Sequence, residues 1–185
     1  MAERTRWQRI AKRIRVPMGF LFAAVFLWLA QPSPALMLAS LALVAPGLWL
    51  RGYAAGYVRK NAELTTTGPY AHTRNPLYLG SLLIGIGFAI AARSWWVGVA
   101  LLAMFFAIYL PVIRSEEEFL RTKFPEFEEY AKQVPRLLPR LTPYSRGDSG
   151  GFSIELYLQH REYNALLGAL AMTAALIVKM RIFKT

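Results

Sequence analysis

The chain has 185 residues, of which 55% are hydrophobic, and it carries a formal net charge of +11. This length allows one domain with a single core. The long uncharged runs exclude a nucleic-acid binder, and the absence of cysteine excludes disulfides, thiolate metal sites and a cysteine nucleophile. An apolar chain that is also strongly basic is typical of a membrane protein whose cations lie at the lipid surface.

Five apolar segments predict an all-α polytopic integral membrane protein with about five transmembrane helices. They cover residues 16–30, 35–57, 76–92, 95–113 and 163–178. A crossing helix needs about 20 apolar residues, a length that the second and fourth segments reach and the others approach. The basic stretch before the first segment is similar to the start of a signal peptide, but no convincing cleavage site follows. We therefore expect a retained first helix and a single membrane domain over residues 1–185.

The distribution of cations predicts the orientation in the membrane. Most cations lie in the N-terminal arm, in the loop after the second segment and between residues 114 and 161, whereas the two hairpin turns contribute only Arg93. Because positive residues are retained on the cytoplasmic side, the N-terminus and both large loops are expected in the cytoplasm, at the bacterial inner membrane. Lys179, Arg181 and Lys184 depart from this rule if the fifth helix crosses completely.

The first cytoplasmic piece, residues 61–78, runs into the sequence GPYAHTRNPLYLG at residues 68–80. Its prolines and glycines predict a turn directly before an apolar helix. One interpretation is an interfacial loop, in which Tyr70 and Tyr78 lie in the aromatic belt and Arg74 reaches lipid phosphates. His72 has no partner His or Cys in the sequence, so no metal site is predicted.

The second cytoplasmic piece is RSEEEFLRTKFPEFEEYAKQVPRLLP, residues 114–139. One interpretation is a helix that begins here, with Ser115 as its N-cap and Glu118 completing a capping box. This interpretation does not explain three consecutive glutamates at the edge of an apolar segment, because carboxylates close to hydrocarbon are costly. Such residues are candidates for a functional role.

Together the two pieces resemble the isoprenylcysteine carboxyl methyltransferases and phospholipid methyltransferases, which are integral membrane enzymes. Their pattern is a G-x-Y turn and R-H-P-x-Y-x-G, then, one span later, E-E-x-x-L-x-x-x-F-G, Y-x-x-Y and V-P-R-x-x-P. The matching residues are Gly68, Tyr70, Arg74, Pro76, Tyr78, Gly80, Glu116, Glu117, Leu120, Phe124, Tyr130, Val134, Pro135, Arg136 and Pro139. The sequence departs from the pattern at Asn75, where the family has histidine, and at Pro125, where it has glycine. Asparagine keeps hydrogen-bonding capacity but does not titrate near neutral pH, so it suits binding rather than proton transfer.

The resemblance implies a methyltransferase that uses S-adenosyl-L-methionine, bound at the cytoplasmic face of the membrane. The cofactor-binding residues that it implies are Leu64, Thr65, Tyr70, Arg74, Asn75, Pro76, Tyr78, Glu116 and Glu117. In this hypothesis Glu116 accepts from the cofactor's ammonium or ribose, and Arg74 pairs with its carboxylate. Arg114 is the catalytic candidate, placed to orient an anionic acceptor or to hold the cofactor. No G-x-G-x-x-G motif follows a predicted strand, so a Rossmann-type site is not expected.

The acceptor is expected to be lipid or lipophilic, because both motifs lie at the membrane boundary where amphiphiles already partition. An isoprenoid-linked carboxylate and a phospholipid amine both fit, and no protein partner or nucleic acid is predicted. Two other functions stay open. Sterol-reductase-like membrane oxidoreductases that use NADPH share a similar turn but usually lack the paired glutamates, and a non-catalytic membrane protein could keep the same scaffold.

The orientation can be tested with a reporter enzyme that is active only in the periplasm. Fused before Met18, the reporter is expected to stay inactive, because the basic arm keeps the N-terminus in the cytoplasm. The matched fusion between Arg93 and Ser94, in a hairpin turn, is expected to be active. Activity of the fusion before Met18 would contradict the predicted orientation.

Overall fold

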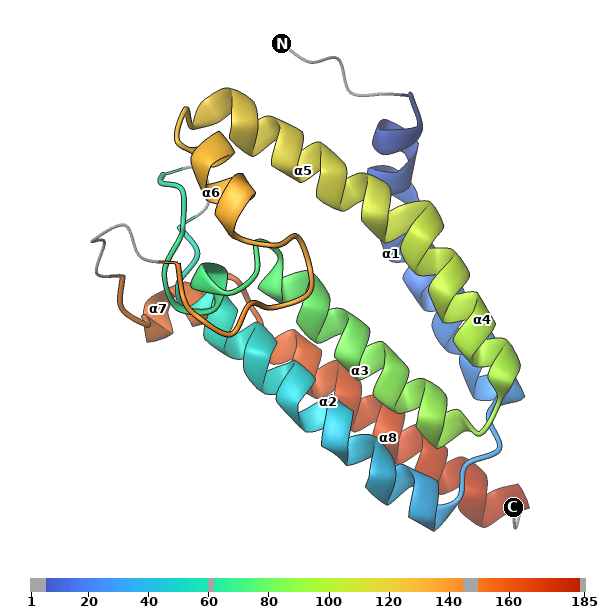
Figure 1. The fold of residues 1–185 in the computed structure, drawn as a ribbon. Coiled ribbons are helices and arrows are strands. Elements are labelled where there is room, and N and C mark those ends of the chain that lie inside the picture. The colour runs from blue at the N-terminus through green and yellow to red at the C-terminus, as the bar shows by residue number, and fades with distance from the viewer. Residues whose placement is uncertain (1–5, 60–61, 145–149, 184–185) are drawn as a thin grey trace.

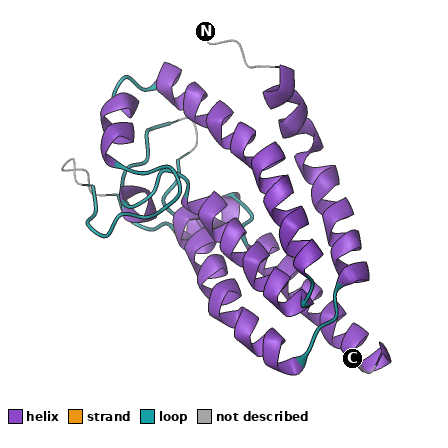
Figure 2. Ribbon diagram, turned by 45° about the vertical axis from the view of Figure 1, so that its right-hand side comes forward, coloured by secondary structure: helices purple, strands orange, loops and turns teal. Residues whose placement is uncertain are grey.

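The computed structural model describes residues 6–59, 62–144 and 150–183, and across these ranges it contains helices and loops but no strand (Figures 1 and 2). The elements in chain order are α1 (Arg6–Leu29), α2 (Pro34–Ala55), the 3-10 helix η1 (Gly68–Ala71), α3 (Pro76–Ala92), α4 (Trp95–Met104), the π-helix η2 (Phe105–Tyr109), α5 (Leu110–Lys123), α6 (Phe127–Gln133), α7 (Ile154–Gln159) and α8 (Tyr163–Phe183). Two positions named in the predictions, Asn61 and Lys184, lie outside the described residues.

The helices confirm the prediction of an all-helical membrane protein. Three of those described are long and apolar enough to cross a bilayer, namely Pro34–Ala55, Trp95–Lys123 and Tyr163–Ile182. Helix α3 has the predicted bounds and is apolar throughout, but its 17 residues make it shorter than these three. The second predicted span ends at Ala55 rather than at residue 57, and the fifth continues to Phe183 rather than ending at residue 178.

Helix α1 begins at Arg6, well before the predicted span that starts at residue 16, because the basic arm is itself helical. One face of this arm is apolar. Ala11 on that face is fully buried against Ile108 and Val112, with Ile14 packed beside them. Burial of this face stabilises the cationic turns at the start of the helix. Most of the arginines in these turns face outward.

A single uninterrupted helix carries the three glutamates. Elements α4, η2 and α5 form one helical run, Trp95–Lys123, so the interpretation in which a helix begins at Ser115 is wrong. Ser115 is buried in the middle of the run, and Glu118 accepts hydrogen bonds from Gln8 of α1 instead of capping a helix start. The apolar residues before Ser115 already form helix, so no new N-terminus exists to be capped.

The helices form two groups that meet at one end. Helix α1 lies along the run from α4 to α5, and α2, α3 and α8 lie side by side (Figure 1). The groups meet around Phe26 and Leu176, which are buried together with residues of α3 and α4. There Lys179 Nζ donates to the carbonyl oxygens of Leu27 at 2.6 Å and Trp28 at 2.9 Å. This ammonium caps the C-terminus of α1, so Lys179 has a structural role within the helix bundle, whatever its part in orientation.

Helices α2 and α3 approach each other closely because glycines face glycines. A Cβ added at Gly80 would lie 2.7 Å from the carbonyl oxygen of Gly47, and one added at Gly47 would lie 2.8 Å from that of Gly80. Small residues of this kind allow membrane helices to pack backbone against backbone. Gly80 of the first motif is therefore explained by packing.

Replacing Gly80 with alanine is expected to lower the stability of the detergent-solubilised protein by about 1–3 kcal/mol, since the added methyl group meets the backbone of Gly47 and Arg51 as well as the Arg51 side chain. Gly98→Ala is the matched control, because a Cβ there meets nothing within 4 Å. Thermal unfolding followed by circular dichroism measures both. Equal melting temperatures for the two variants would contradict this packing.

Candidate functional site

The two motif-bearing pieces come together at one end of the helices. The backbone N–H of Arg74 donates to the carbonyl oxygen of Pro135 at 2.9 Å, and the N–H of Arg140 donates to that of His72 at 3.0 Å. Beneath them Ala71, Phe127, Tyr130, Val134 and Tyr144 form a buried cluster, against which Leu64 packs. The segment that follows α6 is thus held against the turn that precedes α3.

Glu117 lies at the centre of this contact and is only 3% exposed. Its Oε1 accepts from Asn75 Nδ2 at 2.9 Å, and its Oε2 lies 3.0 Å from Arg136 Nε and 2.8 Å from Arg136 Nη2. Arg74 Nε is 3.3 Å from Oε1 and completes the ion pairing, although it makes no aligned hydrogen bond. Both carboxylate oxygens are therefore occupied by side chains of the protein itself.

Asn75 shows why an amide can replace the family's histidine. Its Nδ2 donates to Glu117 and, at 3.0 Å, to the carbonyl oxygen of Arg136. An uncharged amide supplies both protons without any titration. In this structure the position joins the start of α3 to the segment after α6.

Glu116 has a different environment from Glu117. Its Oε2 accepts from the Tyr78 hydroxyl at 3.0 Å, and that hydroxyl in turn accepts from Arg15 Nη1 at 3.1 Å. The carboxylate is only partly buried, and its Oε1 accepts no hydrogen bond from the described residues. Glu116 therefore keeps one carboxylate oxygen to which no described residue donates.

The three consecutive glutamates contact three different parts of the chain. Glu116 contacts α3, Glu117 contacts the segment after α6 together with Asn75, and Glu118 contacts Gln8 of α1. Successive residues of an α-helix point about 100° apart, so three adjacent carboxylates cannot share one ligand face. The three glutamates therefore link three parts of the chain, and Glu116 is the one with a carboxylate oxygen to which no described residue donates.

The remaining predicted residues differ in whether the protein itself holds them in place. Tyr70 is 8% exposed, its carbonyl oxygen accepts from the Tyr130 hydroxyl at 2.7 Å, and burial raises the pKa of both phenols, which stay protonated. Pro76 is buried at the first turn of α3, and Thr65 Oγ1 accepts from the backbone N–H of Arg59 at 3.5 Å. Arg114 is exposed and makes no hydrogen bond or ion pair with the described residues.

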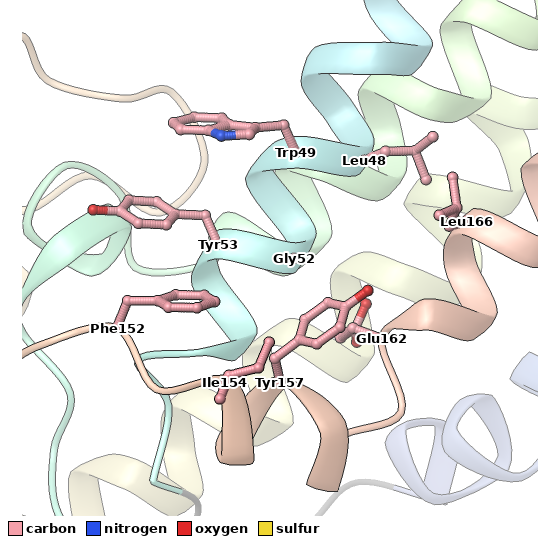
Figure 3. A pocket seen from close by; sticks show the side chains of 9 residues that line it. All are labelled: Leu48, Trp49, Gly52, Tyr53, Phe152, Ile154, Tyr157, Glu162 and Leu166. Atoms are coloured by element: carbon pink, nitrogen blue, oxygen red, sulfur yellow. The ribbon is translucent and has the colours of Figure 1, made fainter.

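Two cavities occur elsewhere in the structure, and neither is lined by the predicted cofactor residues. The first, of about 390 Å³, lies between α2, α7 and α8 (Figure 3). Trp49, Tyr53 and Phe152 stack along one side of it, and its carboxylate, Glu162, is already paired with Arg51 at 2.8 Å. The second cavity, of about 530 Å³, lies between α1, η2 and α8 and has Arg15 in its lining.

Arg15 and Arg136 are site residues that the sequence predictions did not assign. Arg136 lies in the matched V-P-R motif, which could have identified it as a partner for Glu117. Arg15 is one of several arginines in the basic arm, and nothing in its local sequence separates it from the others. Its place beside Tyr78 depends on how α1 packs against the helical run of α4 and α5.

The fold and this site define a helical membrane protein in which a turn before one span and an acidic helix after the next form one polar centre. The profile of the phospholipid methyltransferase family matches residues 35–126, about half of the chain. This match confirms the resemblance seen in the two motifs, over residues 35–126. The matched part holds the turn, α3 and all three glutamates.

Two curated proteins are similar to this chain. The cobalt-zinc-cadmium resistance protein CzcN of Cupriavidus metallidurans is 47% identical over 103 residues, which is 55% of this chain and 46% of that protein. The nickel-cobalt-cadmium resistance protein NccN of Alcaligenes xylosoxydans is 43% identical over 96 residues, or 51% of this chain and 44% of that protein. The alignments thus cover less than half the length of these relatives. No solved structure matches the chain.

Neutralising Glu117 is expected to destabilise the protein. Glu117→Gln leaves Arg74 and Arg136 without their buried counter-charge, and breaking such a pair costs about 3 kcal/mol or more. Thermal unfolding of Glu117→Gln in detergent should show a clear fall in melting temperature. Glu118→Gln is the matched control on the same helix, because a glutamine there can still accept from Gln8. A Glu117→Gln protein as stable as this control would contradict the assigned role.

Proposed function

We propose that this protein is an S-adenosyl-L-methionine-dependent methyltransferase that acts on a membrane-partitioned acceptor. The observation that carries the proposal is the hydrogen bond between Tyr78 of the first motif and Glu116 of the second, within a segment that matches the phospholipid methyltransferase family. It joins the two halves of the predicted cofactor site across one hairpin. Members of this family use S-adenosylmethionine.

The polar groups left open in the structure fit this cofactor. Glu116 Oε1 is available for the ammonium or a ribose hydroxyl, and Arg74, whose Nε is paired with Glu117, has an Nη2 that donates to none of the described residues. A guanidinium in that state suits the cofactor's carboxylate. Leu64, Thr65 and Tyr70 complete the proposed surroundings, and Glu117, with Asn75 and Pro76, holds the segments in place.

When bound, the cofactor would supply an electrophilic methyl group: the acceptor's lone pair bonds to its carbon while the carbon–sulfur bond breaks and leaves its electrons on sulfur. The protein's part is to align the acceptor and to exclude water. The apolar helices that surround the Glu116 region exclude water. Arg114, predicted to contact the polar end of the acceptor, is exposed and stays a candidate for that role.

The names of the two relatives raise a second candidate, direct binding of metal cations. Among residues 6–59, 62–144 and 150–183, no three His, Asp or Glu side chains gather as a metal site, and the chain has no cysteine. The match to the phospholipid methyltransferase family favours an acceptor in the membrane, and we place the activity there, at the cytoplasmic face of the inner membrane. An oxidoreductase that uses NADPH and a non-catalytic scaffold are the alternatives that the test must separate.

Equilibrium binding to the detergent-purified protein tests the proposal. We expect micromolar affinity for S-adenosylhomocysteine and no binding of NADPH. Glu116→Gln should weaken S-adenosylhomocysteine binding about tenfold or more, because a hydrogen bond to a charged group is lost.

Glu118→Gln removes the same charge two residues away and is expected to bind the ligand as the parent protein does. Tight binding of NADPH would favour the oxidoreductase, and binding of neither ligand would favour the scaffold. If Glu116→Gln and Glu118→Gln bind S-adenosylhomocysteine equally well, Glu116 is not a cofactor ligand.

A further inference from the structure

The helical run formed by α4, η2 and α5 is not regular along its whole length. In its middle lies the π-helix η2, where the backbone N–H of Leu110 donates to the carbonyl oxygen of Phe105, five residues earlier. Pro111 follows directly. Proline has no N–H, so the carbonyl oxygen four residues before it, that of Ala107, loses its usual donor within the helix. A π turn inside a long helix is rare and is frequent at functional sites.

Trp7 of α1 supplies the missing donor. Its indole Nε1 donates to the carbonyl oxygen of Ala107 at 3.0 Å. Ala107 lies about 18 Å along the helix from Trp95, where the run begins, and a bilayer core is about 30 Å thick. A run that enters the bilayer at Trp95 therefore holds this carbonyl within the hydrocarbon. No water is available there to replace the indole, so the carbonyl depends on Trp7 for its hydrogen bond.

The first turns of α1 contact the run on both sides of Pro111. Ala11 is fully buried against Ile108, which precedes the proline, and against Val112, which follows it. Glu118, further along α5, accepts a hydrogen bond from the same helix. Helix α1 thus supports the irregular turn from outside. It lies outside the segment that matches the phospholipid methyltransferase family, so that match does not imply this contact.

The π-helix determines which side chain faces Tyr78. A π turn holds one residue more than an α-helical turn, so it rotates the residues after it by about 100° relative to an uninterrupted α-helix. Adjacent side chains differ by the same angle. With α4 held in place, a regular helix would bring Ser115 to the position of Glu116 and Glu116 to that of Glu117. The Tyr78 hydroxyl would then lack its carboxylate, and Glu116 would be paired with the arginines that now contact Glu117.

We propose that Trp7 is a positioning residue for Glu116: by pairing with the carbonyl oxygen that Pro111 releases, it holds the π-helix that turns Glu116 toward Tyr78. The inference rests on the proposed function, in which Glu116 binds the cofactor. Trp7 acts through the helix backbone and is assigned no contact with the ligand. Without its hydrogen bond the irregular turn has more than one arrangement, and only one of them presents Glu116 beside Tyr78. Ligand affinity then falls with the population of that arrangement.

The experiment measures equilibrium binding of S-adenosylhomocysteine to the detergent-purified full-length protein, together with its melting temperature. Trp7→Phe keeps an aromatic ring but has no N–H, and we expect it to weaken binding about tenfold and to lower the melting temperature. Trp7→Arg keeps an N–H donor of similar reach and should bind as the parent protein does. Trp28→Phe is the matched control, because Trp28 lies exposed on the same helix, and both of its values should be unchanged.

A second background separates the hydrogen bond of Trp7 from the packing of its ring. Deleting Ala107 and replacing Pro111 with alanine removes both the extra residue of the π turn and the missing donor. The result, called here the regular-helix background, is an uninterrupted α-helix whose two ends keep their present directions and whose carbonyls have helical donors. In this background Trp7→Phe is expected not to weaken S-adenosylhomocysteine binding, because Glu116 faces Tyr78 without help from Trp7.

Several outcomes would overturn the proposal. Equal affinities of Trp7→Phe and Trp28→Phe would exclude a positioning role, and equal losses in Trp7→Phe and Trp7→Arg would assign the effect to packing of the indole. A tenfold loss on Trp7→Phe in the regular-helix background would do the same, and if that background does not fold, the first two comparisons decide. A parent protein that does not bind S-adenosylhomocysteine contradicts the proposed function. The melting temperatures then judge the hold of Trp7 on the π-helix, which a fall in Trp7→Phe alone supports and equal values in all three variants exclude.

Discussion

The burial of one carboxylate, Glu117, determines how the motif-bearing segments are arranged. An ionised carboxylate is tolerated in a protein interior only when hydrogen bonds and counter-charges replace its water. Here the replacement comes from Asn75 and Arg74 at one carboxylate oxygen and from Arg136 at the other. The turn before α3, the acidic helix and the segment after α6 must therefore fold together.

This arrangement separates structural from chemical roles within one short run of acids. Both carboxylate oxygens of Glu117 are paired with groups of the protein, whereas Glu116 accepts from Tyr78 at one oxygen and, in the function proposed above, uses the other for the cofactor. The rotation of the helix by about 100° per residue is sufficient to produce the difference. Two adjacent glutamates can thus have different surroundings, because the direction in which each side chain points determines its partners. The substitution of Asn75 for histidine is compatible with this division, because the structural role needs donors and not a titrating ring.

The fold was largely predictable because its helices follow from apolar segment length. The bounds of α3 and the polytopic helical class came from that property alone. The start of α1 was not predicted, since cationic turns are helical here only through the burial of Ala11 against Ile108 and Val112, a contact between distant parts of the chain. The same limit applies to the site. The motifs indicated Tyr78, Asn75 and the glutamates, but the place of Arg15 depends on helix packing, and packing geometry is not encoded in a local pattern.

The cap that Lys179 places on α1 has a consequence for the biogenesis of the protein. Its hydrogen bond to Leu27 joins residues 152 positions apart. During synthesis the carbonyl oxygens at the end of α1 therefore stay unpaired by Lys179 until α8 has been made. Contacts this distant in sequence form slowly. The cavity between α1, η2 and α8 is likewise incomplete until α8 has entered the bilayer, so a chain that lacks α8 could not hold a ligand there.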